Sequence, residues 1–182
     1  MVPPEDEGVT EDLIARASWT WGLSLIAMTV AIHAMGVVAL ALTMMRIPIE
    51  LEKRRVGLRF VIPTVTGVIG VVGLLLAVLH GVEATIWAAA YVWLGALGSF
   101  ADAMLYSVDS MTTRGASGLA LDRPWRMMGA LESADGMLLF GISTAYIFAV
   151  IQVYWPMLSR RRLRHARHDQ PVAPKLRIDL DQ

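Results

Sequence analysis

The sequence predicts an all-α membrane protein with three transmembrane helices plus one short re-entrant helix and its loop. Three observations predict this class: 55% of the 182 residues are apolar, the mean hydropathy is +0.53, and several uncharged runs reach about twenty residues. A helical run of that length is long enough to cross the hydrocarbon core of a bilayer.

The composition also excludes several classes of function. The 16 basic and 16 acidic residues balance, so net charge favours no particular partner. The chain has no cysteine, which excludes disulfides, thiolate nucleophiles and cysteine-based zinc sites. The sequence also shows no glycine-rich phosphate loop, nucleophile–base pair or nucleic-acid motif, so we expect neither an enzyme nor a nucleic-acid partner.

The chain begins with a segment that we expect to be an acidic external arm, residues 1–18, in which a short helix can start after Thr10. Trp19 and Trp21 follow, as in the aromatic belt at a membrane interface. Residues 20–45 carry no formal charge and predict the first membrane span.

A basic loop, residues 46–59, separates the first two spans. The positive-inside rule assigns such a loop to the cytoplasm, so the N-terminus is expected outside. Residues 60–79 return across the membrane, and residues 19–83 are therefore predicted to form a two-helix membrane hairpin. The loop contains Arg46, Lys53, Arg54, Arg55 and Arg59 against Glu50 and Glu52.

Residues 84–101 carry no charge and could be a separate crossing. That crossing would place the arginine-rich residues 160–167 outside, against the charge rule. We therefore predict that the segment continues the second helix, with a bend near Gly81 or Gly95, and leads into an external re-entrant loop.

The last predicted span is residues 127–155, followed by a basic cytoplasmic tail, residues 157–182. The arginines from Arg160 to Arg167 act either as a topological stop signal or as a contact for anionic lipids of the bilayer.

The segment between the second and last spans carries a specific order of features, and from Trp87 to about Gln152 it resembles the pore module of the potassium-channel superfamily. Its lead-in is His80-Gly81-Val82-Glu83. The features are Tyr106, Ser107, Asp109 and the closing Thr112-Thr113, then Pro124-Trp125-Arg126, Glu132, Gly136 and Gly141, as in bacterial two-helix ion-channel domains.

The resemblance implies that residues 84–156 form a channel-like pore module with an outer segment. Within it, residues 101–113 would be the pore helix, residues 113–118 the selectivity filter and residues 125–155 the inner helix. It also implies a homotetramer around a central axis, monovalent ions as permeant species, no cofactor, and a place in a bacterial inner (plasma) membrane.

The filter departs from the family pattern. Potassium filters align backbone carbonyls that replace the hydration shell of the ion. Thr112, Thr113, Gly115 and Gly118 would still supply oxygens and backbone freedom. Because Ala116 replaces the bracing tyrosine, we expect an ion channel with weak or altered potassium selectivity. The family has Thr-Val-Gly-Tyr-Gly-Asp where this chain has Thr113-Arg114-Gly115-Ala116-Ser117-Gly118.

Arg114 admits two interpretations. In the first, its guanidinium packs behind the filter and pairs with Asp109, with Glu132 as the second partner, and braces the filter. In the second, symmetric copies of Arg114 form a positive ring and make an anion-permeable pore. A third interpretation, which concerns the whole chain, is a non-conducting channel-like scaffold or regulatory subunit.

Several other side chains carry expectations. Asp102 is expected to cap the pore helix, and Gly136 and Gly141 to be gating hinges of the inner helix. Glu132 and Asp135 are functional candidates, with Arg114, Arg123 or Arg126 as alternative ion-pair partners.

Three further side chains could take part in metal or proton chemistry. His80 and Glu83 could bind a metal or sense pH, but two ligands indicate a local hydrogen bond instead, so no metal site is assigned. His33 is expected to bond a neighbouring helix.

Overall fold

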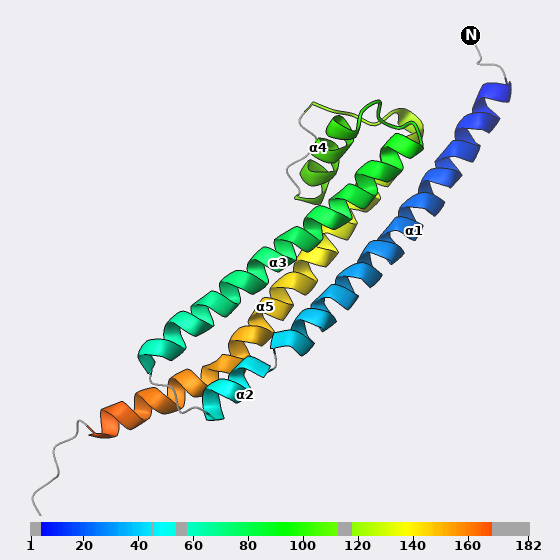
Figure 1. Ribbon diagram of the computed structural model, residues 1–182. Coiled ribbons are helices and arrows are strands. Elements are labelled where there is room, and N and C mark those ends of the chain that lie inside the picture. Colours follow the sequence, from blue (N-terminus) through cyan, green and yellow to red (C-terminus); the bar gives the residue numbers. More distant parts are fainter. Residues whose placement is uncertain (1–4, 45, 54–57, 113–117, 169–182) are drawn as a thin grey trace, which may run out of the picture.

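The computed structural model describes residues 5–44, 46–53, 58–112 and 118–168, and no strand occurs among them. The elements are α1 (Glu5–Met44), α2 (Arg46–Lys53), α3 (Leu58–Trp93), α4 (Phe100–Met111), the 3₁₀ turn η1 (Arg123–Trp125) and α5 (Arg126–His168). Helices α1, α3 and α5 lie lengthwise beside one another, and α4 lies at the end of the bundle where α1 begins (Figure 1).

Three helices are long and apolar enough to span a membrane, which confirms the predicted number of spans. They are Arg16–Met44, Arg59–Trp93 and Arg123–Pro156. Helix α3 continues without interruption past Gly81 to Trp93, so residues 84–93 extend the second span. The chain leaves α3 at Gly95, whose φ of +70° is a conformation that glycine adopts without strain.

The structure changes the boundaries of three segments. Helix α1 already starts at Glu5, so most of the expected acidic arm is helical, because no proline lies between Pro4 and Pro48. Residues 46–53 of the basic loop form α2. Helix α5 extends through Pro156 to His168, so the basic tail begins as helix.

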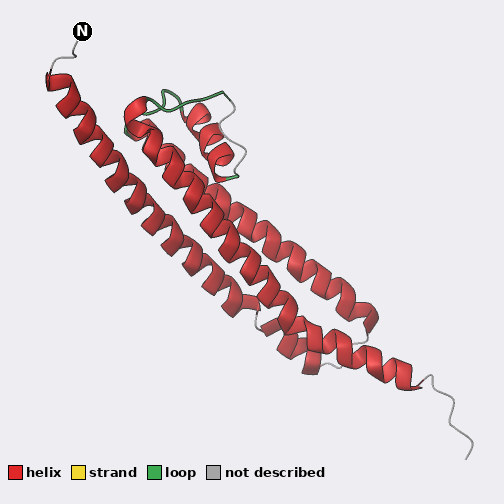
Figure 2. Cartoon of the chain, turned by 180° about the vertical axis from the view of Figure 1, so that it is seen from behind, coloured by secondary structure: helices red, strands yellow, loops and turns green. Residues whose placement is uncertain are grey.

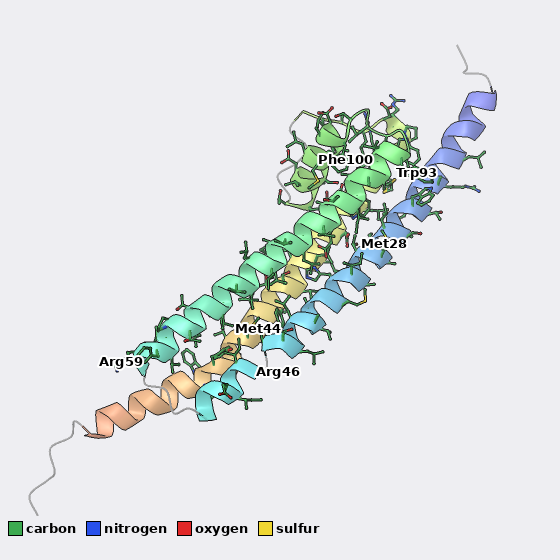
Figure 3. The ribbon with its side chains drawn as sticks, viewed as in Figure 1. Met28, Met44, Arg46, Arg59, Trp93 and Phe100 are labelled. Atoms are coloured by element: carbon green, nitrogen blue, oxygen red, sulfur yellow. The ribbon has the colours of Figure 1, made fainter. Side chains whose placement is uncertain are left out.

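Interfacial side chains mark the two ends of the bundle. Trp21 and Trp93 meet edge to face at one end, with ring centroids 5.2 Å apart. Arg46 and Arg59 lie at the opposite end (Figure 3). Tryptophan and arginine are typical of the headgroup region, so both pairs fit the ends of the apolar spans.

The helices pack through two separate apolar clusters. The first, nearer to α4, includes Leu25, Trp87, Tyr91, Tyr106 and Met128. The second lies toward the opposite end, mostly between α3 and α5, and consists of Val61, Val65, Val68, Val72, Leu76, Val150 and Tyr154. A set of buried polar residues lies between these two clusters along the spanning helices: Thr29, His33, Glu83, Glu132, Asp135 and Ser143.

Helix α4 starts with a side-chain cap. Ser99 is the N-cap: its Oγ accepts a hydrogen bond from the Asp102 backbone N–H at 3.1 Å and donates to Asp102 Oδ2 at 2.8 Å. The prediction that Asp102 caps this helix is therefore wrong in position. Asp102 lies in the first turn, where its carboxylate holds the cap and faces the positive end of the helix dipole.

Two glycines of α5 let α4 approach closely. The Tyr106 hydroxyl lies where a Cβ of Gly129 would project, and a Cβ at Gly136 would lie 2.6 Å from both the Cα and the carbonyl oxygen of Met111. Since higher residue numbers in α4 meet higher numbers in α5, the two helices run in the same direction. Both views place α4 beside the same end of the bundle (Figures 1 and 2).

This packing predicts opposite effects of alanine at two glycines of one helix. Gly136→Ala puts a methyl group against the Met111 backbone, which must shift, so we expect a loss of about 1–3 kcal/mol. Gly141→Ala meets no atom within 4 Å and should leave stability unchanged or raise it by up to about 1 kcal/mol through helix propensity. Thermal unfolding of both variants in detergent measures the difference, and equal midpoints would contradict this packing.

Candidate functional site

A layer of polar side chains crosses the bundle between the two apolar clusters. Thr29 and His33 come from α1, Glu83 from α3, and Asp135 and Ser143 from α5, and each is no more than 5% exposed. Ionisable groups at such depth within membrane helices are costly unless they find partners, which makes this layer the main functional candidate.

Asp135 links the three spanning helices. Its Oδ2 accepts a hydrogen bond from Thr29 Oγ1 at 2.7 Å and another from Trp87 Nε1 at 3.1 Å. Its Oδ1 has no hydrogen-bond partner among the described residues. The partners expected for Asp135 were arginines, whereas those found are neutral donors from α1 and α3.

Glu132 lies one turn before Asp135 on α5 and is fully buried. Its Oε2 accepts a hydrogen bond from the Tyr91 hydroxyl at 2.7 Å. Ser107 of α4 lies near the same carboxylate, although neither Glu132 Oε1 nor Ser107 Oγ has a described partner in hydrogen-bond geometry. The Tyr91 ring packs edge to face on Tyr106, with centroids 5.4 Å apart, so this carboxylate lies where α4 joins α3 and α5.

The second group in the layer joins His33, His80, Glu83 and Ser143. His33 Nδ1 lies 2.8 Å from Glu83 Oε1, and His80 Nδ1 lies 3.2 Å from Glu83 Oε2. On the other side of both rings, Ser143 Oγ lies 3.1 Å from His33 Nε2 and 3.2 Å from His80 Nε2. His33 and Glu83 are completely buried, whereas the His80 side chain is 28% exposed.

This group confirms one expectation and enlarges another. His33 does bond a neighbouring helix, through Glu83 of α3. His80 and Glu83 are close to each other, as predicted, but they also meet His33 and Ser143 from two other helices. The predicted local pair is therefore part of a contact among three helices.

Only part of the expected filter lies within the described residues. Thr112 ends α4, and its hydroxyl donates to the Val108 carbonyl at 2.7 Å. Gly118 has a φ of +82°, a conformation that suits glycine. Thr113, Arg114, Gly115, Ala116 and Ser117 lie outside the described residues.

Of the predicted filter brace, Asp109 and Glu132 lie within the described residues and Arg114 does not. Asp109 is 2% exposed, on the buried face of α4 with Tyr106, Ser107 and Ser110. Its pairing with Arg114 stays a prediction, because Arg114 lies outside the described residues.

The predicted hinges differ from each other in their surroundings. Gly136 is buried against Met111, so its small size has a packing role, whereas Gly141 is exposed and a Cβ added there would meet no described atom within 4 Å. Helix α5 is continuous through both. Their role as gating hinges stays a prediction.

The sequence gives little indication of three residues that complete the layer or bond to it. Thr29, Ser143 and Trp87 are each ordinary in a membrane helix taken alone. A signal was present in α3, where His80, Glu83, Trp87 and Tyr91 recur every three or four residues and so share one helix face. The same spacing joins Thr29 to His33 and Glu132 to Asp135.

Comparison with protein-family models, with curated proteins and with solved structures finds no match to this chain.

Removing the Tyr91 hydroxyl should destabilise the bundle. Tyr91→Phe leaves the buried Glu132 carboxylate without its hydrogen-bond donor, which we expect to cost about 1–2 kcal/mol. Tyr154→Phe is the matched control, because Tyr154 is 2% exposed and its hydroxyl has no partner among the described residues. Chemical unfolding in detergent measures both, and a loss of equal size at the two positions would contradict the role of the Tyr91–Glu132 bond.

Proposed function

We propose that the chain is a subunit of a channel-like integral membrane protein, in which α4 is the pore helix and leads into the predicted filter, residues 113–118, of a re-entrant pore segment. The observation that carries this proposal is the depth that α4 reaches along α5. Its last residue, Met111, packs on Gly136, ten residues after the start of α5 at Arg126. At 1.5 Å per residue this is about 15 Å along α5 from its first residue, well inside the third apolar span.

A chain that descends so far must return through the same side to reach η1 at the start of α5. Irregular backbone at membrane depth is stable only when it is buried in protein or lines a wet cavity. The polar side chains on the buried face of α4, Ser107, Asp109 and Ser110, fit such a position. These features favour a pore segment over a surface helix.

The direction of α4 also favours ion conduction. Its C-terminal end points toward the middle of the third span, and the carbonyl groups there carry the negative end of the helix dipole. The exposed Thr112 adds a hydroxyl at this end. A negative dipole end in a wet cavity favours a cation, and without the family's filter sequence we expect weak or altered potassium selectivity.

The outer face of α4 supports assembly from several copies. Leu105 is 47% exposed, Val108 is 41% exposed and Phe100 is 50% exposed, whereas the opposite face contacts α3 and α5. Other copies would cover this face when the re-entrant segments converge on one axis. With the resemblance to potassium channels, this favours a homotetramer.

The charge distribution supports an orientation. Helix α2, the start of α3 with Arg59, and the last turns of α5 with residues 160–167 lie at the end opposite to α4 (Figure 1). In a bacterial inner membrane, the positive-inside rule then favours an orientation with the N-terminus and α4 outside and the C-terminus in the cytoplasm. At that end the residues from Arg160 to Arg167 would contact anionic lipids.

Two alternatives keep the same fold. Arg114 as a ring around the axis would make the pore permeable to anions. A non-conducting scaffold or regulatory subunit would keep the re-entrant segment without an open path.

The re-entrant position predicts chemical access at depth. Because the chain has no cysteine, single cysteines can be introduced without background. Thr112→Cys should react with a charged, membrane-impermeant thiol reagent added on the N-terminal side of proteoliposomes. Met28→Cys is the control, because Met28 lies at a similar level of the bundle: its neighbour Thr29 bonds Asp135, which precedes Gly136. Met28 is on the outer surface of α1, which would face lipid, so this cysteine should not react (Figure 3). Equal protection of both cysteines would count against a wet re-entrant segment.

Conduction itself is tested in planar bilayers with the purified protein. We expect unitary currents with a reversal potential that shows cation preference and weak discrimination between potassium and sodium. Arg114→Gln separates the alternatives: loss of thermal stability with unchanged ion preference supports the brace, and a change of preference with an unchanged fold supports the ring. Silence across salts and voltages would contradict the channel and support the scaffold.

A further inference from the structure

We propose that His33, His80 and Glu83 bind a divalent transition-metal ion of the zinc class in the middle of the bundle. Two imidazoles and one carboxylate form a ligand set that zinc uses in proteins, usually with one position left for another ligand. The three side chains each offer a ligand atom within 4.8 Å of the others. This site is independent of whether the chain conducts ions.

A proton count shows where a cation is missing. The group has four contacts: two join Glu83 to the Nδ1 atoms, and two join Ser143 Oγ to the Nε2 atoms. With an ionised Glu83, two neutral imidazoles supply one proton each and the serine supplies one. Three protons cannot fill four contacts, so one contact brings two lone pairs together.

The geometry identifies that contact. Glu83 Oε2 has no hydrogen-bond partner among the described residues, although His80 Nδ1 lies only 3.2 Å away. The other three contacts have hydrogen-bond geometry, at 2.8, 3.1 and 3.2 Å. The electron-rich pair that lacks a proton is therefore His80 Nδ1 and Glu83 Oε2.

A metal ion suits this pair better than a proton does. A proton must lie close to the line that joins the two atoms, and the contact lacks that alignment. A zinc ion lies off that line, about 2.0–2.1 Å from each ligand, which separates tetrahedral ligands by about 3.3 Å. The observed 3.2 Å agrees with this separation. A change of tautomer that moves the His33 proton from Nδ1 to Nε2 would free Nδ1 as the third ligand.

The surroundings complete the site. Ser143 Oγ can accept from both Nε2–H groups and so fixes the tautomer that presents each Nδ1 to the metal. Asp135 is close enough to Glu83 and His33 to interact with them electrostatically. With Glu83 and Asp135 ionised, a divalent ion leaves the layer neutral, which a membrane interior favours. The partly exposed His80 provides the side of entry.

Zinc and cobalt binding to the purified, EDTA-treated protein tests the site. We expect about one zinc ion per chain by mass spectrometry of the metal, a higher thermal midpoint with zinc, and a tetrahedral absorption spectrum with cobalt. Glu83→Gln and His80→Gln should each weaken zinc binding at least tenfold. Ser143→Ala should weaken it about 10–100-fold. Both Gln variants are checked for folding by circular dichroism, and the partly exposed His80 gives a variant that tolerates change.

Glu132→Gln is the matched control, since Glu132 is an equally buried carboxylate outside the ligand set, and it should bind zinc as the unaltered chain does. Substoichiometric zinc in the unaltered protein, or Glu83→Gln binding as tightly as Glu132→Gln, would overturn the site. Either result would mean that an additional proton, and not a metal ion, occupies the contact between His80 and Glu83.

Discussion

The hydrogen bonds of Asp135 are the interactions on which the arrangement of the three spanning helices most depends. A carboxylate in a bilayer has no water to solvate it, so its position is fixed by the donors that the protein supplies. Thr29 of α1 and Trp87 of α3 supply them to Asp135 of α5. Apolar contacts alone do not select one rotation of a helix in lipid, since lipid tails are as apolar as leucine. The polar bonds, together with close packing such as that at Gly136, therefore favour one inward face of each helix.

The order of layers along the helices follows from this constraint. The two apolar clusters lie on either side of the polar layer. Trp87 and Tyr91 belong to one cluster, and Trp87 donates a hydrogen bond to Asp135 of the layer while Tyr91 donates to Glu132 beside it. Aromatic side chains with a polar atom at one end suit such a boundary, because they bury a large ring and still satisfy a carboxylate. Between the two clusters, the carboxylates of the layer therefore depend on hydrogen-bond partners that the bundle itself supplies.

The coarse fold could be predicted from the sequence because hydropathy marks membrane helices directly. Uncharged runs between basic clusters predicted three spans, and the charge rule correctly rejected a crossing at residues 84–101. Cap positions were harder. Ser99 and Asp102 are both good capping residues, and the sequence does not say which one begins the helix, whereas the hydrogen bonds at Ser99 do.

The polar layer could be predicted only in part, because its contacts join residues that are far apart in the sequence. His80 and Glu83 are near neighbours in the sequence, so their contact is predictable, but His33 lies 50 residues from Glu83 and Ser143 lies 110 residues from His33. Those pairings require the rotation of three helices, which is a packing property. The spacing of polar residues on α3 indicates the inward face, yet it does not name the partners on α1 and α5.

One consequence of the layout is that the polar layer and α4 meet on a single turn of α5. Asp135 holds α1 and α3, and the next residue, Gly136, holds the end of α4 at Met111. Glu132, one turn earlier, bonds Tyr91, whose ring packs on Tyr106 of α4. A rotation of this turn would alter the hydrogen bonds of Asp135 and the contact between Gly136 and Met111 together. The residues that join α1 and α3 to α5 and the residue on which α4 ends therefore share the single turn 132–136 of α5.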